Sequence, residues 1–100
     1  MNITAQEARE IMDAEEGYII LDVRTQAEYD EKHIPGAILI PDYEIKERAE
    51  EELTDKDQLI LVYCRSGRRS KLAAEALVEL GYTNIKEFGG IIDWHYEVTK

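Results

Sequence analysis

The chain has 100 residues, of which 44% are hydrophobic and 34% charged, and its 22 acidic and 12 basic side chains give a formal net charge of −10. This composition is typical of a soluble globular protein, and we expect residues 1–100 to form a single domain around one core. The acidic balance argues against nucleic acid as a partner, because a nucleic-acid-binding surface needs a broad basic face. No apolar run approaches the roughly 20 residues that span a bilayer, so we expect no membrane association.

The cysteine content bears on the compartment. Cys64 is the only cysteine, so no intrachain disulfide can form. The first seven residues lack the basic and apolar regions of a secretion signal. We therefore expect a cytoplasmic protein in a reducing environment.

Helix and strand patterns alternate along the chain. Continuous apolar runs predict strands over residues 18–21 and 59–63, and the first suits a strand buried on both faces. A short apolar strand is predicted over 37–40 and a further strand over 85–88. Two capping boxes, Thr4 to Glu7 and Thr25 to Glu28, predict helix starts. The first two helices are predicted from residue 4 to a break at Gly17 and from residue 25 to about 31. A third, capped by Pro41-Asp42, is predicted from 43 to about 53, and a fourth from the cysteine loop to Leu80. A turn at Gly89-Gly90 and a closing helical segment over 91–96 complete the chain.

This alternation predicts βαβ units, and therefore an α/β fold with a mostly parallel sheet and helices on both faces. Ligands of such sheets bind beyond the carboxyl ends of the strands. Asp22 and Arg24 follow the end of one predicted strand, and Cys64 follows another. We expect these residues to share one rim.

The stretch Cys64-Arg65-Ser66-Gly67-Arg68-Arg69-Ser70 joins a buried strand to a helix. A loop that opens a helix gathers backbone N–H groups at the positive end of the helix dipole, and Gly67 permits the necessary curl. No acidic residue occurs from 58 to 74, although four basic residues do. We expect the sulfur to be held as a nucleophilic thiolate. The alternative is a small core residue, because free cysteines are among the most buried residue types.

Three blocks together resemble the rhodanese (sulfurtransferase) domain family, in an order and spacing that extend from about Ile3 to Trp94. They are Leu21-Asp22-Val23-Arg24-Thr25 with Glu28-Tyr29, then His33-Ile34-Pro35-Gly36-Ala37, then the cysteine loop with Gly89-Gly90-Ile91 and Trp94 behind it. The resemblance implies a rhodanese-like α/β fold on a sheet of about five strands, mostly parallel. The family often has glycine before the histidine of the second block, where this chain has Lys32, and the turn geometry there is open.

The resemblance also implies roles for individual residues. Cys64 is the expected nucleophile and persulfide carrier. Asp22 and Arg24 are expected to support the loop. Asp22 is either a structural acid paired with an arginine or a turn carboxylate. The residues expected to bind the substrate, through loop amides and the charges of the arginines, are Arg65, Ser66, Gly67, Arg68, Arg69 and Ser70. The expected reaction moves a sulfane sulfur from a small anionic donor such as thiosulfate to cyanide, a cellular thiol or a protein sulfur acceptor. It needs no metal and no organic cofactor.

Two other functions remain open. The chain could be a non-catalytic rhodanese-like interaction or sulfur-relay module, since a fold does not fix a function. A cysteine-dependent phosphatase or arsenate reductase also uses a cysteine-to-arginine loop, but with five intervening residues, whereas four separate Cys64 from Arg69. Two histidines, His33 and His95, are too few to form a metal site with Cys64.

Overall fold

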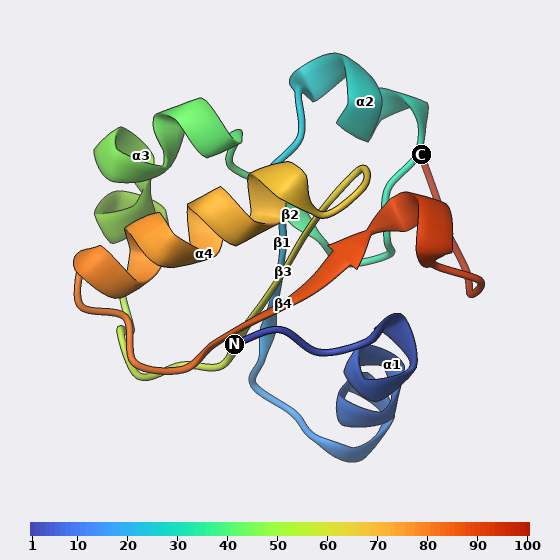
Figure 1. The fold of residues 1–100 in the computed structure, drawn as a ribbon, viewed down its shortest axis with the longest axis horizontal. Helices are drawn as coiled ribbons and strands as arrows, with labels where there is room; N and C mark the ends of the chain where they lie inside the picture. Colours follow the sequence, from blue (N-terminus) through green and yellow to red (C-terminus); the bar gives the residue numbers. More distant parts are fainter.

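The computed structural model describes residues 1–100, which form a four-stranded parallel sheet with helices on both faces (Figure 1). The strand order is β2-β1-β3-β4, and all pairs are parallel. The strands are β1 (Ile19–Asp22), β2 (Ile38–Leu39), β3 (Ile60–Cys64) and β4 (Ile85–Gly90). The helices are α1 (Ala5–Ala14), α2 (Gln26–Glu31), α3 (Ile45–Glu52) and α4 (Arg68–Glu79), with 3₁₀ turns η1 (Asp42–Glu44) and η2 (Ile91–Asp93). None of the helices is long and apolar enough to cross a membrane.

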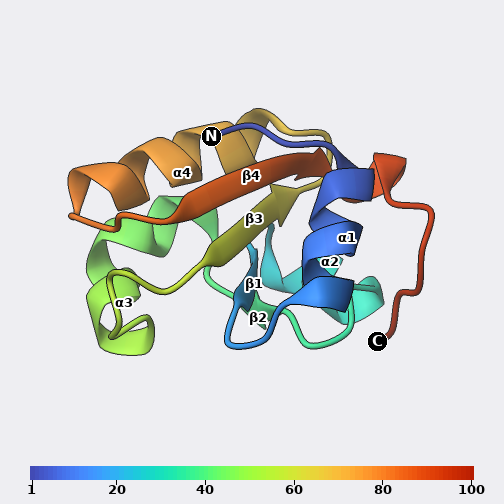
Figure 2. The same ribbon diagram turned by 90° about the horizontal axis from the view of Figure 1, so that it is seen from below.

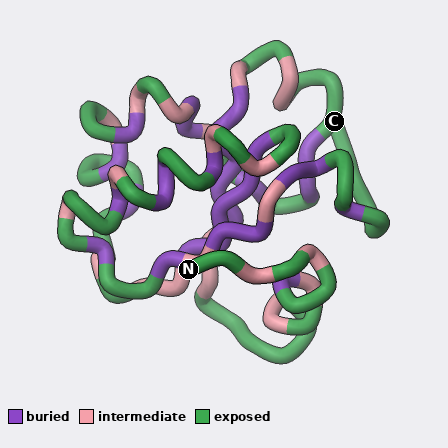
Figure 3. The backbone as a smooth tube through the Cα atoms, viewed as in Figure 1, coloured by how far each residue is buried: buried purple, intermediate pink, exposed green.

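β3 lies in the middle of the sheet, and all five of its residues are buried. Side chains alternate between the two faces of a strand. Val62 and Cys64 therefore pack on the α3 and α4 side, whereas Leu61 and Tyr63 pack on the α1 side with Trp94. Figure 3 shows the result as a buried centre surrounded by exposed outer helix faces. The expected alternation of helices and parallel strands is confirmed.

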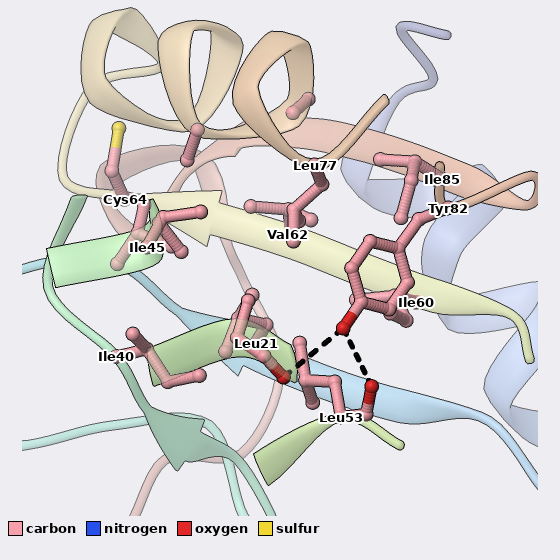
Figure 4. Packing of buried hydrophobic residues seen from close by; sticks show 14 residues of the cluster. Leu21, Ile40, Ile45, Leu53, Ile60, Val62, Cys64, Leu77, Tyr82 and Ile85 are labelled. Carbon is pink, nitrogen blue, oxygen red and sulfur yellow. Dashed lines mark hydrogen bonds between the residues drawn. The ribbon is translucent and has the colours of Figure 1, made fainter. Parts of the chain in front are cut away.

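The layer on the α4 side reaches from the end of β3 to the end of α3 (Figure 4). Leu77 of α4 packs into it and is fully buried. The hydroxyl of Tyr82 lies 3.0 Å from the carbonyl oxygen of Ala49 and 2.6 Å from that of Leu53, so its one hydrogen has two acceptors within reach at the C-terminal end of α3. This polar tie holds α3 against the same core that holds α4.

The sheet has four strands where the resemblance implied about five. At the β4 edge, Asn2 forms a single parallel bridge with Glu87, and Figure 2 shows the N-terminal segment running along β4. The segment stays short because the capping box at Thr4 starts α1 immediately after it. The fifth position of the sheet therefore holds a bridge instead of a full strand.

Both capping boxes are confirmed, with both reciprocal hydrogen bonds in each. Two boundary predictions are wrong. α1 ends at Ala14, before Gly17. The predicted cap at Pro41-Asp42 does not form, because Asp42 is itself the first residue of η1. Neither η1 nor α3 has a hydrogen bond from a capping side chain.

Two further predictions fail near the C-terminus. Gly89 and Gly90 are not a turn, because β4 continues through Gly90. The helical segment predicted over 91–96 stops at Asp93, where Trp94 takes an extended backbone and its indole N–H donates to the carbonyl of Glu97 at 3.0 Å. Burial of Trp94 thus takes precedence over continued helix.

Candidate functional site

The thiol of Cys64 lies at the carboxyl end of β3, on the face covered by α4 (Figure 4). The backbone N–H of Gly67 donates to its Sγ atom, with a nitrogen–sulfur distance of 3.0 Å. This is the only one of the five predicted amides that bonds to the sulfur here; those of Arg65, Ser66, Arg68 and Arg69 do not. Cys64 is 1% exposed and packs in the core, so its burial is that of the alternative interpretation, and the sulfur is not open to solvent in this conformation.

The backbone of Gly67 explains why its amide points at the sulfur. Gly67 is the N-cap of α4 and has φ +107°, in the left-handed region that favours glycine. The chain therefore reverses within three residues of Cys64 and enters the helix with the Gly67 N–H directed at the thiol. The curl predicted at Gly67 is confirmed.

The loop rests on the end of β4. The pairing of β3 with β4 shifts here, because Val62 pairs with Glu87 and Cys64 with Gly90, so two steps along β3 match three along β4. A Cβ atom on Gly90 would overlap the carbonyl of Arg65. The backbone of β4 thus supports the cysteine loop at a distance that only glycine allows.

Three residues of the loop face solvent: Arg65, Ser66 and Arg68 are exposed. Neither Arg65 nor Arg68 is paired with a carboxylate, so both keep the positive charge that the sequence predicted for this rim. Beside Arg65 lies a cavity of about 340 Å³, lined by Arg24, Glu28, Glu31, Lys32, Arg65, Ile91 and Ile92. An anion approaching the loop would enter a site with free cations.

Arg69 has a different role from the other two arginines. Its two terminal nitrogens donate to the two carboxylate oxygens of Glu28 on α2, at 2.7 and 2.9 Å. These bonds lower the pKa of Glu28 to about 2, against the effect of its burial and with help from Thr25. The same pairing raises the pKa of Arg69, and the nearby Cys64 contributes in the same direction. The charge of Arg69 is therefore largely balanced by Glu28.

Ser70 was expected to contact substrate, but in this structure its side chain is buried and hydrogen-bonded within the protein. It is fully buried, and its hydroxyl lies 2.9 Å from Oε1 of Glu87. The carbonyls of Gly67 and Gly89 lie within 3.0 and 3.3 Å of the same oxygen. In this conformation Ser70 ties the first turn of α4 to β4.

Asp22 and Arg24 form a buried pair at the end of β1, next to the end of β3. Nε and Nη2 of Arg24 donate to the carboxylate at 3.0 and 2.7 Å, and its backbone N–H donates at 2.9 Å. Both interpretations of Asp22 are therefore correct, as an arginine partner and as a turn carboxylate. The Tyr63 hydroxyl donates to the same carboxylate at 2.7 Å, and burial followed by this negative charge raises the Tyr63 pKa.

The turn around Lys32 needs no glycine. Lys32 has φ −168°, an extended backbone that any residue adopts, and its carbonyl accepts a 2.7 Å hydrogen bond from Arg24. His33 stacks on Tyr29 at 3.7 Å between ring centroids, so its ring packs against α2. The described side chains include no group of three or more His, Cys, Asp or Glu that could hold a metal ion.

Sequence reasoning missed two carboxylates that organise the loop, Glu28 and Glu87. Glu28 was identified only as part of a capping box. Its second role is to pair with Arg69, which is 41 residues away in the sequence. Glu87 is 4% exposed, and Lys86 beside it in the same strand is half-buried. Charged residues inside a strand of a sheet covered on both faces were the available signal.

Comparison with known proteins supplies an independent line of support. The family model for the rhodanese-like domain matches residues 4–97 of the sequence. Over 73 residues the chain is 44% identical to the thiosulfate sulfurtransferase PspE of Escherichia coli (strain K12), covering 73% of this chain and 70% of that protein. Over 93 residues it is 38% identical to the putative sulfur carrier protein YrkF of Bacillus subtilis (strain 168), covering 92% of this chain but only 49% of that protein.

Solved structures agree with these sequence matches. A structure of a rhodanese with anions from E. coli superposes with a TM-score of 0.78 at 40% identity, covering 83% of this chain and 98% of that one. The rhodanese-like domain of an Anabaena protein superposes with a TM-score of 0.90 at 26% identity, covering 98% and 77%.

Proposed function

The chain belongs to the rhodanese-like domain family and is a sulfurtransferase of the rhodanese type; from that premise we propose that it moves a sulfane sulfur through a persulfide on Cys64. The observation that carries the proposal is the Gly67 N–H donating to Sγ at the start of α4. A sulfur held at that point receives a hydrogen bond and the positive end of the helix dipole, both of which favour its anionic form.

The proposed first step is attack of the Cys64 thiolate on the outer sulfur of thiosulfate. The sulfur–sulfur bond of thiosulfate breaks, sulfite leaves with the bonding electron pair, and the enzyme keeps a persulfide anion. In the second step a thiophile attacks the outer persulfide sulfur and releases the thiolate. With cyanide the product is thiocyanate, and with a thiol it is a new persulfide. No proton needs to move if the thiol is ionised at the start.

The donor has to reach a sulfur that is almost fully covered. Arg65, Ser66 and Arg68 are the exposed residues of its loop, and the loop has to open for the donor to reach the sulfur. The free charges of Arg65 and Arg68 attract a dianion to that point. Their position supports a small anionic donor in preference to a neutral one.

A sulfur-relay role is the second candidate, and one observation favours it. A relative at 38% identity is named a putative sulfur carrier protein. In that role the same persulfide passes to a protein acceptor. A reducing cytoplasm suits either role, because a lone cysteine is kept as a thiol there. The phosphatase alternative gains no support, since Arg69 is bound to Glu28.

The test is a thiosulfate–cyanide assay on wild type and Cys64→Ser, with mass spectrometry of the thiosulfate-treated proteins. We expect thiocyanate from the wild type alone, and one added sulfur on Cys64. Equal rates for the two proteins would end the enzymatic proposal. A wild type that acquires the sulfur, but passes it to a protein thiol and not to cyanide, would favour the relay.

A further inference from the structure

Glu87 is a buried charged residue that the reaction above does not use. It lies on β4 and is 4% exposed. A carboxylate in such a place is costly unless donors surround it. Glu87 has three donors, and none of them is a basic side chain.

Two of the donors come from the segments that build the cysteine loop. Oε1 accepts from the Ser70 hydroxyl at 2.9 Å, in the first turn of α4, and from the Gly89 N–H at 3.0 Å, beside the shift in the β3–β4 pairing. The third donor, the side-chain amide of Asn2, bonds to Oε2. One carboxylate thus joins the helix start that follows the loop to the strand end beneath it.

These bonds lead to the thiol through the backbone. The Ser70 hydroxyl lies 3.0 Å from the carbonyl of Gly67, whose N–H donates to Sγ of Cys64. A hydroxyl has one hydrogen, so it donates to Glu87 or to a carbonyl, but not to both at once. Glu87, the charged acceptor of the three, is the favoured partner of that hydrogen, and the bond then links the first turn of α4 to β4.

We infer that Glu87 is a positioning residue of the sulfur loop, which keeps the Gly67 amide aimed at the Cys64 sulfur through Ser70 and Gly89. This inference rests on the proposed persulfide function for its effect on rate. Its structural part, the ordering of the loop, does not depend on that function.

The test compares Glu87→Met, which keeps the length of the side chain without its acceptors, with Glu87→Gln, which keeps one acceptor oxygen. The measurement is single-turnover persulfide formation with excess thiosulfate, quenched and read by mass spectrometry. We expect the rate constant of Glu87→Met to fall about 10- to 100-fold, the range for small misplacement of reacting groups. Glu87→Gln should recover most of that loss, and Ser70→Ala should lower the rate without adding to the Glu87→Met effect.

A purely structural role gives a different result. Partial unfolding lowers the amplitude of the single turnover but leaves its rate constant unchanged. Leu53→Ala, a core change in the residue after α3, is the control: it should lower the melting temperature and leave the rate constant intact. A wild-type rate constant in Glu87→Met would overturn the inference.

Hydrogen–deuterium exchange separates this inference from the proposed function. We expect faster exchange over residues 65–70 in Glu87→Met, with the rest of α4 unchanged and with Glu87→Gln close to wild type. A wild type that takes no sulfur from thiosulfate would defeat the proposed function and leave this readout standing. Unchanged exchange in the loop of Glu87→Met would defeat the inference itself.

Discussion

Arg69 and Glu28 are 41 residues apart, and they meet through two hydrogen bonds of 2.7 and 2.9 Å between the start of α4 and α2. The pair is partly shielded, with 30% and 26% of the two side chains exposed. It closes one side of the loop that holds Cys64. It also removes one of the three loop arginines from the free positive charge at the rim.

The first prediction concerns the stability that this pair supplies. A pKa of Glu28 lowered from 4.5 to about 2 corresponds to roughly 3 kcal/mol in a fully shielded pair. Solvent screening reduces this, and we expect Glu28→Gln to lower the free energy of unfolding by about 1–2 kcal/mol. Urea denaturation at pH 7 measures it. The control is Glu52→Gln, an exposed partner of Arg48 within α3, which should cost less than about 0.5 kcal/mol.

The same pair predicts a pH dependence. The pKa of Glu28 in the folded protein, about 2, lies below its ordinary value of 4.5. The contribution to stability is therefore complete above about pH 4.5 and disappears as the pH falls toward 2. The difference between wild type and Glu28→Gln should shrink over this range. A difference that stays constant from pH 7 to pH 2.5 in urea titrations would contradict the assignment.

The free cations of the rim predict a change in donor affinity. Arg65→Gln and Arg68→Gln should each raise the KM for thiosulfate about 3- to 10-fold, because each removes one unpaired charge near the thiol. The effect should decline with added salt, as screening requires. Lys46→Gln on α3 provides the matched loss of charge, and we expect no change in KM from it. An equal effect from all three variants would mean that net charge alone attracts the donor.

The contact between Gly90 and the loop predicts a loss of activity from a single methyl group. Gly90→Ala would push its Cβ into the carbonyl of Arg65, so the loop has to move. We expect kcat to fall at least about tenfold, since small displacements of reacting groups carry large rate penalties. Gly17→Ala is the control: its φ of +77° strains an alanine by about 1–2 kcal/mol, but open space surrounds it. That variant should lose stability and keep its kcat.

Local rules explain which parts of this structure could be predicted. Both capping boxes act within four residues, and β3 is recognisable as a central strand because its apolar run is unbroken. The cysteine loop follows from one such strand, one glycine and one helix start. Asp22 also found its expected arginine, because Arg24 is only two residues away.

The remaining features depend on how distant elements meet. The partner of Arg69 is set by where α2 lies against α4, and that of Glu87 by the register shift between β3 and β4. Burial of Cys64 has the same origin: the apolar layer that includes Val62 and Leu77 extends to the end of the strand and takes in the sulfur. Charge near a cysteine predicts its chemistry but not its accessibility.

The short N-terminal segment has a consequence for how copies of this protein behave at high concentration. Ile3 donates to the carbonyl of Glu87, and the Glu87 N–H donates to the carbonyl of Met1, at 2.9 and 2.8 Å. An outer strand with free amides is a template on which a second chain can add its own strand. Residues 1–3 occupy that template on β4, so this edge of the sheet is shielded from the addition of a strand from a second copy.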